Sequence, residues 1–243
     1  MKKDVFGWSS DRLPCAARVA RWGHYGQPVL IYPTAGGDCE EIERFQLVAA
    51  LAPLIEAGRI KVYSIDSVAG QHWLSGHGSV EYRSRVQNSF DAYVYREVVP
   101  LVRNDCAGAP VEVITAGASI GAFNAVAALV RHPDAFRVAI GMSGTYDLSK
   151  YLEGRWNDDF YFSSPLHFLP GLADSGWLDG LRRRFVLLPT GEGRWEDPGE
   201  SWRLASALGA RGIPNRVDPW GPEWDHDWHT WRVMLPRYLA ELS

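Results

Sequence analysis

Apolar residues in this chain form short β-branched runs, separated by longer segments whose apolar positions recur at helical spacing. The runs predict buried strands at residues 28–32, 60–65, 111–115, 136–142 and 184–189. Because helical segments fall between most of these runs, strand and helix alternate along the chain. Such alternation favours a mostly parallel sheet with right-handed crossovers and helices on both faces. The sequence therefore predicts an α/β fold.

Two weaker strands and a set of helices complete this prediction. Residues 13–22 alternate roughly between apolar and polar positions, which indicates an antiparallel edge strand, and residues 215–218 form a last short strand. Helices are expected at residues 39–57, 80–103, 120–130, 198–211 and 228–242. Pro53 is expected to kink or split the first of these helices. Residues 66–79 are expected to form a polar loop.

One segment interrupts the alternation of strands and helices. Residues 147–180 are irregular, rich in aromatic side chains and punctuated by prolines. They lie between two predicted strands, and ligands of open α/β sheets bind at the carboxyl ends of the strands. We therefore expect a short aromatic lid inserted into a single domain that spans residues 1–243. The alternative is a packed helical excursion that does not touch the substrate.

Charge and cysteine content exclude several classes of protein. The 243 residues carry a net charge of −4 without a block of Lys or Arg, which argues against nucleic acid and anionic membranes as partners. No apolar run approaches the length of a membrane span. Cys15, Cys39 and Cys106 are odd in number and widely spaced, which suits a reducing cytoplasm. We expect a cytoplasmic protein that needs no metal ion or cofactor.

The strongest chemical motif lies between a predicted strand and a predicted helix. Residues 117–121 read Gly-Ala-Ser-Ile-Gly, which is a G-x-S-x-G with Ser119 at its centre. A serine on a sharp strand-to-helix turn, flanked by small residues, is typical of the nucleophile of α/β-hydrolases. The alternative is an ordinary turn with a capping serine. The flanking strand and helix favour the nucleophile, because they supply the context that the motif requires.

A serine nucleophile needs a base to take its proton, and α/β-hydrolases supply that base from a histidine late in the chain. His226 lies in the loop before the last predicted helix, where it can reach back over the sheet. His229 already belongs to that helix, so a structural or pocket-rim role is expected for it. The sequence therefore favours His226 as the base.

The carboxylate that orients the histidine is expected in the loop after the strand at residues 184–189. Asp197 begins the pattern Asp-Pro-Gly-Glu, in which Asp suits the N-cap of a helix and Pro its first position. This gives Asp197 a structural role and makes Glu196 the preferred acid. Asp197 stays the next alternative, and Glu192, nearest the strand end, is the third.

Three motifs together carry a resemblance to a known family. They are the G-x-S-x-G with its flanking residues, Trp195-Glu196-Asp197-Pro198, and the H-x-W-x-x-W of residues 226–231. In these motifs the chain resembles the Putative esterase family of α/β-hydrolases, which includes esterase D (S-formylglutathione hydrolase), feruloyl esterases and bacterial mycolyltransferases. The resemblance extends from about residue 29 to residue 242. Many relatives have Asp in a G-x-x-D where this chain has Glu196, so the acid remains open among the three candidates.

The resemblance implies roles for individual residues. It implies Ser119 as the nucleophile and His226 as the base. It also implies an oxyanion hole formed by the backbone N–H of Ile120 and by an N–H of the loop after the strand at residues 28–32. Ala35 is the best match in that loop, and Gly36 is the next.

The expected activity is hydrolysis of a small-molecule carboxylic ester by a Ser-His-acid triad, through a covalent acyl-enzyme. Acyl transfer at the same site is one alternative, and an α/β-hydrolase fold that serves only as a binding module is another. The aromatic lid and the tryptophans that cluster late in the chain favour an apolar or aromatic acyl group. The residues expected to line the substrate pocket are Trp73, Tyr151, Trp156 and Trp228.

Overall fold

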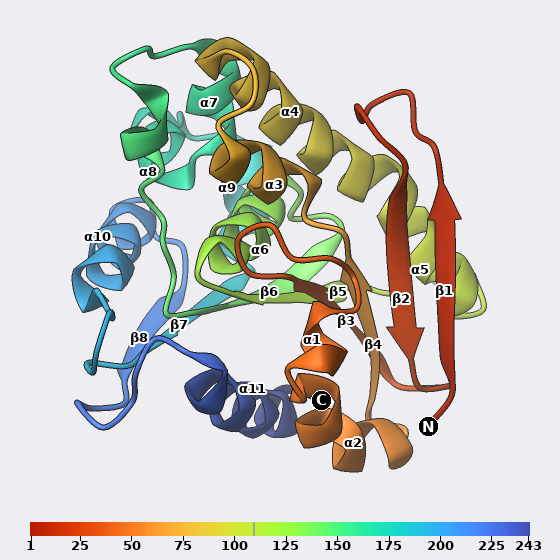
Figure 1. The fold of residues 1–243 in the computed structure, drawn as a ribbon. Coiled ribbons are helices and arrows are strands. Elements are labelled where there is room, and N and C mark those ends of the chain that lie inside the picture. Colours follow the sequence, from red (N-terminus) through yellow and green to blue (C-terminus); the bar gives the residue numbers. More distant parts are fainter. Residues whose placement is uncertain (109) are drawn as a thin grey trace.

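The computed structural model describes residues 1–108 and 110–243, and these residues form one eight-stranded sheet (Figure 1). The order of its strands is β1-β2-β4-β3-β5-β6-β7-β8. The strands are β1 (Lys3–Trp8), β2 (Ala17–Trp22), β3 (Gln27–Tyr32), β4 (Ile60–Ile65), β5 (Val113–Ala118), β6 (Phe136–Met142), β7 (Phe185–Thr190) and β8 (Asn215–Pro219). Strand β2 pairs antiparallel with β1 and β4. Strands β4, β3, β5, β6, β7 and β8, in this order across the sheet, pair in parallel. The predicted α/β fold with a mostly parallel sheet is confirmed.

The helices of the described residues follow the strands in the expected alternation. They are α1 (Glu41–Arg44), α2 (Leu47–Glu56), α3 (Val68–Ser75), α4 (Val80–Tyr93), α5 (Val99–Asp105), α6 (Ile120–Arg131), α7 (Asp158–Ser163), α8 (Pro165–Phe168), α9 (Gly176–Leu181), α10 (Pro198–Gly209) and α11 (Trp228–Leu242). A π-helical segment η1 (Val94–Val98) joins α4 to α5, and short 3₁₀ segments are η2 (Ser149–Leu152) and η3 (Leu169–Gly171). The predicted long helix at residues 80–103 is therefore present, with one wider turn inside it.

Three parts of the fold differ from the predicted elements. Strand β1 was not predicted, because its residues alternate only between half-buried and exposed positions at the sheet edge. Residues 68–75 form helix α3 instead of a polar loop, since Val68 and Trp73 bury one face of the segment. The helix predicted at residues 39–57 breaks at Gln46, which has a φ of 63°, whereas Pro53 lies inside α2.

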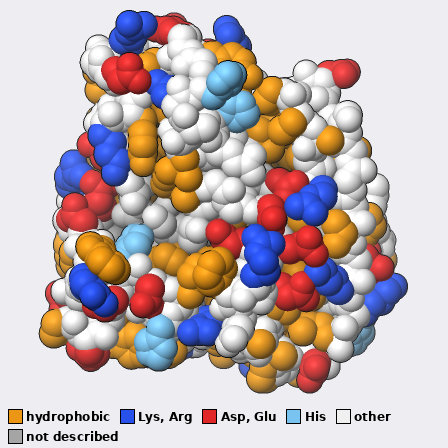
Figure 2. Space-filling view, in the orientation of Figure 1, with side chains coloured by type: hydrophobic (Ala, Val, Ile, Leu, Met, Phe, Trp, Pro, Cys, Tyr) orange, Lys and Arg blue, Asp and Glu red, His pale blue; other side chains and the backbone are white. Residues whose placement is uncertain are grey.

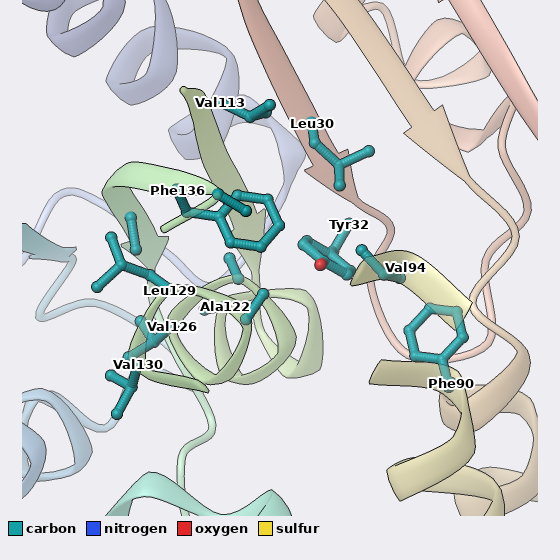
Figure 3. Packing of buried hydrophobic residues seen from close by; sticks show 14 of the residues in the cluster. Leu30, Tyr32, Phe90, Val94, Val113, Ala122, Val126, Leu129, Val130 and Phe136 are labelled. Atoms are coloured by element: carbon teal, nitrogen blue, oxygen red, sulfur yellow. The ribbon is translucent and has the colours of Figure 1, made fainter. Parts of the chain in front are cut away.

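Helices cover both faces of the sheet (Figure 1). Helices α2 and α11 pack on one face over a core that includes Val29, Ile31, Ile114 and Leu235. The other face lies under α4, α5, α6 and α10. Figure 3 shows part of this core, formed by Ala122, Val126, Leu129 and Val130 of α6, the strand residues Leu30, Tyr32, Val113 and Phe136, Phe90 of α4 and Val94 of η1. These two layers hold the ends of the parallel strands in place.

Residues 147–180 form short helices that pack mainly on other helices. Helix α7 contacts α4, and α8 contacts α6 and α10. Phe160 is fully buried beside Trp73, so part of the aromatic content of this segment belongs to the core. Trp156 and Phe162 are each 56% exposed. The aromatic lid predicted for this segment thus remains an expectation.

The surface seen in Figure 2 mixes acidic and basic side chains over α1 and the edge formed by β1 and β2. Ion pairs account for much of this mixture, including Lys3 with Glu40, Arg18 with Asp66 and Arg44 with Asp38. Opposite charges therefore neutralise one another locally on this face. No helix among the described residues has both the length and the apolar character that a membrane span requires.

Candidate active site

Ser119 occupies a strained turn between β5 and α6. Its φ is 56° and its ψ is −125°, a conformation that side chains with a Cβ rarely adopt. A Cβ on Gly117 would lie 2.2 Å from the carbonyl oxygen of Gly121, and a Cβ on Gly121 would lie 2.5 Å from that of Pro33. Both glycines of the motif are therefore required by close backbone contacts. Non-glycine residues keep such strain mostly at functional sites.

The loop after β3 lies against the start of α6, as the close approach of Gly121 to Pro33 shows. Ala35 in this loop has a φ of 32°, and its carbonyl oxygen accepts a hydrogen bond of 2.8 Å from the Ser67 hydroxyl. Among the described residues, the backbone N–H groups of Ala35, Gly36 and Ile120 donate to no backbone or side-chain acceptor. These three expected oxyanion-hole donors thus lie on two adjoining segments and have no acceptor within the described part of the protein.

A buried carboxylate supports the loop after β3. Glu41 accepts hydrogen bonds from the backbone N–H of Thr34 at 2.8 Å and from its hydroxyl at 2.9 Å. Burial raises the pKa of Glu41, although both hydrogen bonds act in the opposite direction. The carboxylate occupies the space that a side chain on Gly37 would need. Glu41 therefore helps to fix the loop that carries Ala35.

His226 and Glu196 approach each other from two different loops. The Nδ1 atom of His226 lies 3.6 Å from Oε2 of Glu196. The Glu196 side chain is only 1% exposed, whereas that of His226 is 22% exposed. The backbone N–H of His226 donates to the carbonyl oxygen of Arg194 at 3.0 Å, which ties the two loops together. The imidazole can thus reach solvent on one side and meet a buried carboxylate on the other.

The other candidate acids lie elsewhere. Asp197 is the N-cap of α10, and its carboxylate accepts a hydrogen bond of 3.1 Å from the backbone N–H of Gly199. Glu192 is exposed. His229 is also exposed, and its ring stacks on Trp224 with 5.9 Å between ring centroids. Of the three carboxylates that the sequence offered, Glu196 is the one in contact with His226.

The hydroxyl of Ser119 makes no hydrogen bond to another described residue, including His226. Catalytic hydrogen bonds are often long or poorly aligned before substrate binds, so the lack of this hydrogen bond is compatible with a nucleophile and its base. The loop after β6 connects the two parts, because the backbone N–H of Thr145 donates to the carbonyl oxygen of Ser119 at 3.2 Å.

A polar cavity of about 400 Å³ opens beside His226. Its lining is Ser143, Gly144, Thr145, Asp147, Ser149, Lys150, Trp195, Asp197, Glu200 and His226. Trp195 is 75% exposed at its rim and has a φ of 64°. This lining is more polar than the predicted apolar or aromatic pocket.

The four residues expected to form the substrate pocket lie outside that lining. Trp73 is buried and donates its indole N–H to Gln87 at 3.1 Å, and Tyr151 packs beside it. Trp156 packs on Phe160 and His167 at the surface. Trp228 stacks on Phe45 with 4.8 Å between ring centroids. Trp73 does belong to the same buried cluster as Ile120, the residue that follows Ser119.

Sequence reasoning missed two residues that contact the proposed acid and base. Ser143 donates a hydrogen bond to Glu196, and Trp231 donates one to Ser143. Trp231 is the last residue of the H-x-W-x-x-W motif, so the motif held a signal for it. Ser143 follows a strand in an unremarkable Ser-Gly pair and offered no comparable signal.

No group of three or more His, Cys, Asp or Glu side chains within residues 1–108 and 110–243 is arranged to hold a metal ion.

Comparison with known proteins gives a family and a fold. The model of the family described as Putative esterase matches residues 82–242. A search of the curated proteins finds no significant match. Among solved structures, a ferulic acid esterase is 15% identical with a TM-score of 0.74, over 99% of this chain and 96% of that chain.

Two further structures extend this likeness. An S-formylglutathione hydrolase from Agrobacterium tumefaciens is 14% identical with a TM-score of 0.73, over 98% of this chain and 93% of that chain. MPT51 (FbpC1) of Mycobacterium tuberculosis is 17% identical with a TM-score of 0.70, over 100% of this chain and 98% of that chain. At such low identity the likeness shows the fold alone. The α/β-hydrolase fold and the relatives indicated by the sequence motifs are confirmed.

Proposed function

This chain belongs to the Putative esterase family and is a serine esterase, and from that premise we propose that it hydrolyses its ester with the triad Ser119–His226–Glu196 through a covalent acyl-enzyme. One observation carries the proposal. His226 lies 3.6 Å from the buried carboxylate of Glu196, and the loop that lines the same cavity is hydrogen-bonded to the strained turn of Ser119.

In the first half of the reaction, Ser119 Oγ attacks the carbonyl carbon of the ester while His226 accepts the hydroxyl proton. Glu196 favours the tautomer with the proton on Nδ1, which leaves Nε2 free to act as the base. The tetrahedral intermediate collapses when the C–O bond to the alcohol breaks. His226 returns the proton to the departing alkoxide, so the alcohol leaves neutral and the acyl group stays on Ser119.

In the second half, His226 takes a proton from water, and the resulting hydroxide attacks the acyl carbon. Collapse of this second intermediate releases the carboxylic acid and restores the Ser119 hydroxyl. Both intermediates carry a negative oxygen, for which the N–H groups of Ile120 and of Ala35 or Gly36 are the proposed donors. Within residues 1–108 and 110–243 these N–H groups have no other acceptor, which supports this role, because preorganised donors stabilise charge as it develops.

The cavity beside His226 suggests where part of the substrate binds. Its hydroxyl groups, its carboxylates and Lys150 suit a polar portion of the ester. We propose that residues 1–243 form a single domain and that residues 147–180 are its lid. Asp147, Ser149 and Lys150 support that assignment, because the beginning of the segment lines the cavity.

An active-site probe tests the proposal directly. A fluorophosphonate should label Ser119, as mapped by mass spectrometry, and the protein should hydrolyse p-nitrophenyl acetate. Ser119→Ala should lose label and lower kcat on the order of a millionfold. Ser84→Ala, which changes a buried serine of α4, is the matched control. A wild-type protein that neither labels nor hydrolyses any ester of a graded panel would be a binding module, and labelling at another serine would move the nucleophile.

A further inference from the structure

A chain of hydrogen bonds leads from α11 to the proposed acid. The indole Nε1–H of Trp231 donates to Ser143 Oγ at 3.0 Å, and Ser143 Oγ donates to Glu196 Oε1 at 2.5 Å. Trp231 is 4% exposed, Ser143 is 3% exposed and the Glu196 side chain is 1% exposed. The chain is therefore almost entirely shielded from water, where hydrogen bonds to a charged group are strongest.

The chemistry of the three groups fixes the direction of this chain. An indole nitrogen only donates, and an ionised carboxylate only accepts. The Ser143 hydroxyl has one proton, and because it already accepts from Trp231, that proton points to Glu196 Oε1. This occupies one carboxylate oxygen and leaves Oε2 facing His226 Nδ1 at 3.6 Å. Thr190 Oγ1 approaches the same Oε2 at 3.5 Å.

Trp231 contacts the base as well as the acid's partner. Its ring meets the imidazole of His226 edge to face, with 5.2 Å between centroids and an interplanar angle of 86°. Both residues belong to the segment where α11 begins. The N-cap Asp227 accepts a hydrogen bond of 2.8 Å from the N–H of His229, which fixes the start of the helix. The spacing of the H-x-W-x-x-W motif thus places Trp231 where its ring contacts His226 and its indole N–H donates to Ser143, the hydrogen-bond partner of Glu196.

The backbone of Ser143 is held as firmly as its side chain. Its φ is 45°, and its N–H donates to the carbonyl oxygen of Pro189 at 2.8 Å. Two residues later, Thr145 donates to the carbonyl oxygen of Ser119 at 3.2 Å. A strained non-glycine residue persists only where its surroundings determine it. The loop after β6 therefore links the turn of the nucleophile to the carboxylate.

We propose that Ser143 and Trp231 are positioning residues, which hold one oxygen of Glu196 so that the other faces His226. The proposal rests on the triad proposed above and deepens it. Neither residue takes part in a bond-breaking step. Both act through Glu196, and their loss should lower kcat with little change in KM, because the Ser143 hydroxyl, although Ser143 lines the cavity, donates to the buried carboxylate.

A double-mutant cycle between Ser143 and Glu196 tests this role. Ser143→Ala should lower kcat about 10- to 100-fold in the parent protein, since a hydrogen bond to a charged group is lost. In the Glu196→Gln background the same change should lower kcat less than about threefold, because the carboxylate on which Ser143 acts is gone. An equal loss in both backgrounds would mean that Ser143 acts independently of Glu196 and would overturn the proposal.

A second variant keeps the test valid if Ser143→Ala folds poorly. Trp231→Phe retains a ring against His226 but removes the indole N–H, and it should lower kcat with the same dependence on Glu196. Trp220→Phe is the matched control, because the Trp220 indole also donates to a hydroxyl, that of Tyr238, at 2.6 Å. The control should leave kcat within about twofold of the parent value. Equal kcat losses in Trp231→Phe and Trp220→Phe would contradict a specific role for Trp231.

The two proposals fail in different ways. If the parent protein shows no fluorophosphonate label on Ser119 and no ester hydrolysis, the proposed function fails, and the positioning role that rests on it fails with it. If the parent labels and turns over while both Ser143→Ala and Trp231→Phe keep the parent kcat, only the positioning role fails. Folding of each variant is checked by its melting temperature.

Discussion

Asp105 and Glu196 are carboxylates held at opposite ends of the parallel strands, and their partners differ in kind. Asp105 lies 2.7 Å from Lys61 Nζ, and it accepts hydrogen bonds of 2.7 Å from Arg21 and from the Tyr63 hydroxyl. Burial opposes ionisation there, but the hydrogen bonds from Lys61, Tyr63 and Arg21 outweigh it and lower the pKa of Asp105 to about 2. Two permanent cations thus keep this carboxylate charged.

Glu196 is more deeply buried but is satisfied mainly by neutral groups. Its oxygens meet the hydroxyls of Ser143 and Thr190, and His226 is the only ionisable partner within ion-pair distance among the described residues. A nearby lysine or arginine would balance the carboxylate at all times. With an imidazole instead, the balance changes when His226 gains a proton. The difference distinguishes a carboxylate that stabilises the fold from one that can stabilise a charge formed during a reaction.

The difference between Glu196 and Asp105 depends most strongly on the imidazole of His226. His226→Ala should lower kcat on the order of a millionfold, because the proposed base for the serine proton is lost. Steady-state hydrolysis of p-nitrophenyl acetate measures the effect. His229→Ala is the matched control, since its exposed ring stacks on Trp224 away from Glu196. A larger loss in the control than in His226→Ala would show that Glu196 serves a different base.

Neutralising Glu196 should have the next largest effect. Glu196→Gln should lower kcat on the order of ten-thousandfold, since the carboxylate no longer fixes the tautomer of His226 or stabilises its charged form. The melting temperature should change little, because the amide keeps the shape and can still accept from Ser143. Kinetics and thermal melts on one preparation measure both quantities. A variant that melts early and keeps its kcat would make Glu196 a structural carboxylate like Asp105.

The reverse pattern is expected for Asp105. Asp105→Asn should leave kcat unchanged and lower the free energy of unfolding at pH 7 by about 1.5–3 kcal/mol, because Lys61 and Arg21 lose their common partner. The folded-state pKa lies below the ordinary value of 3.8, so this stabilisation is present above pH 4 and disappears as pH falls toward 2.

Urea unfolding of the parent and variant at several pH values tests that expectation. The difference between them should be constant near neutral pH and shrink below pH 4. Asp174→Asn is a control, because the Asp174 side chain is 82% exposed in its pair with Arg182 and should contribute little. A difference that stays constant down to pH 3 would mean that the ion pairs do not cause the stability.

Local sequence patterns predicted most of the sheet and the helices that cover it. Strand β6 and helix α11 begin and end where the apolar pattern predicted, because each buries a continuous face. Strand β1 and helix α3 escaped prediction for a shared reason. One is an edge strand with few buried positions, and the other buries only one side of a segment that also carries Gln and His. Tertiary packing, more than local preference, determines such elements.

The residues of the site also separate into those that local sequence patterns predicted and those that depend on tertiary packing. Ser119, His226 and Glu196 were predicted from motifs and chain order, and Asp197 is the N-cap of α10 as its sequence pattern predicted, while Glu196 lies next to His226. Ser143 could not be predicted, because its importance comes from a side-chain contact across 53 residues of sequence. Most of the cavity lining was also missed, since it combines residues 143–150, residues 195–200 and His226, which meet only in the folded chain.

The smallest expected effect concerns the neighbour of Glu196. Asp197→Ala should lower the free energy of unfolding by about 0.5–2 kcal/mol, because α10 loses its N-cap, and should spare most of kcat. Asp197→Asn should restore the stability, since Asn caps a helix about as well as Asp. Thermal melts and turnover of the two variants measure these effects. The two adjacent carboxylates would then have separate roles, with Glu196 acting on His226 and Asp197 stabilising the start of α10. A large kcat loss in Asp197→Ala that Asn fails to repair would instead show that the charge of Asp197, at the edge of the cavity, contributes to the reaction.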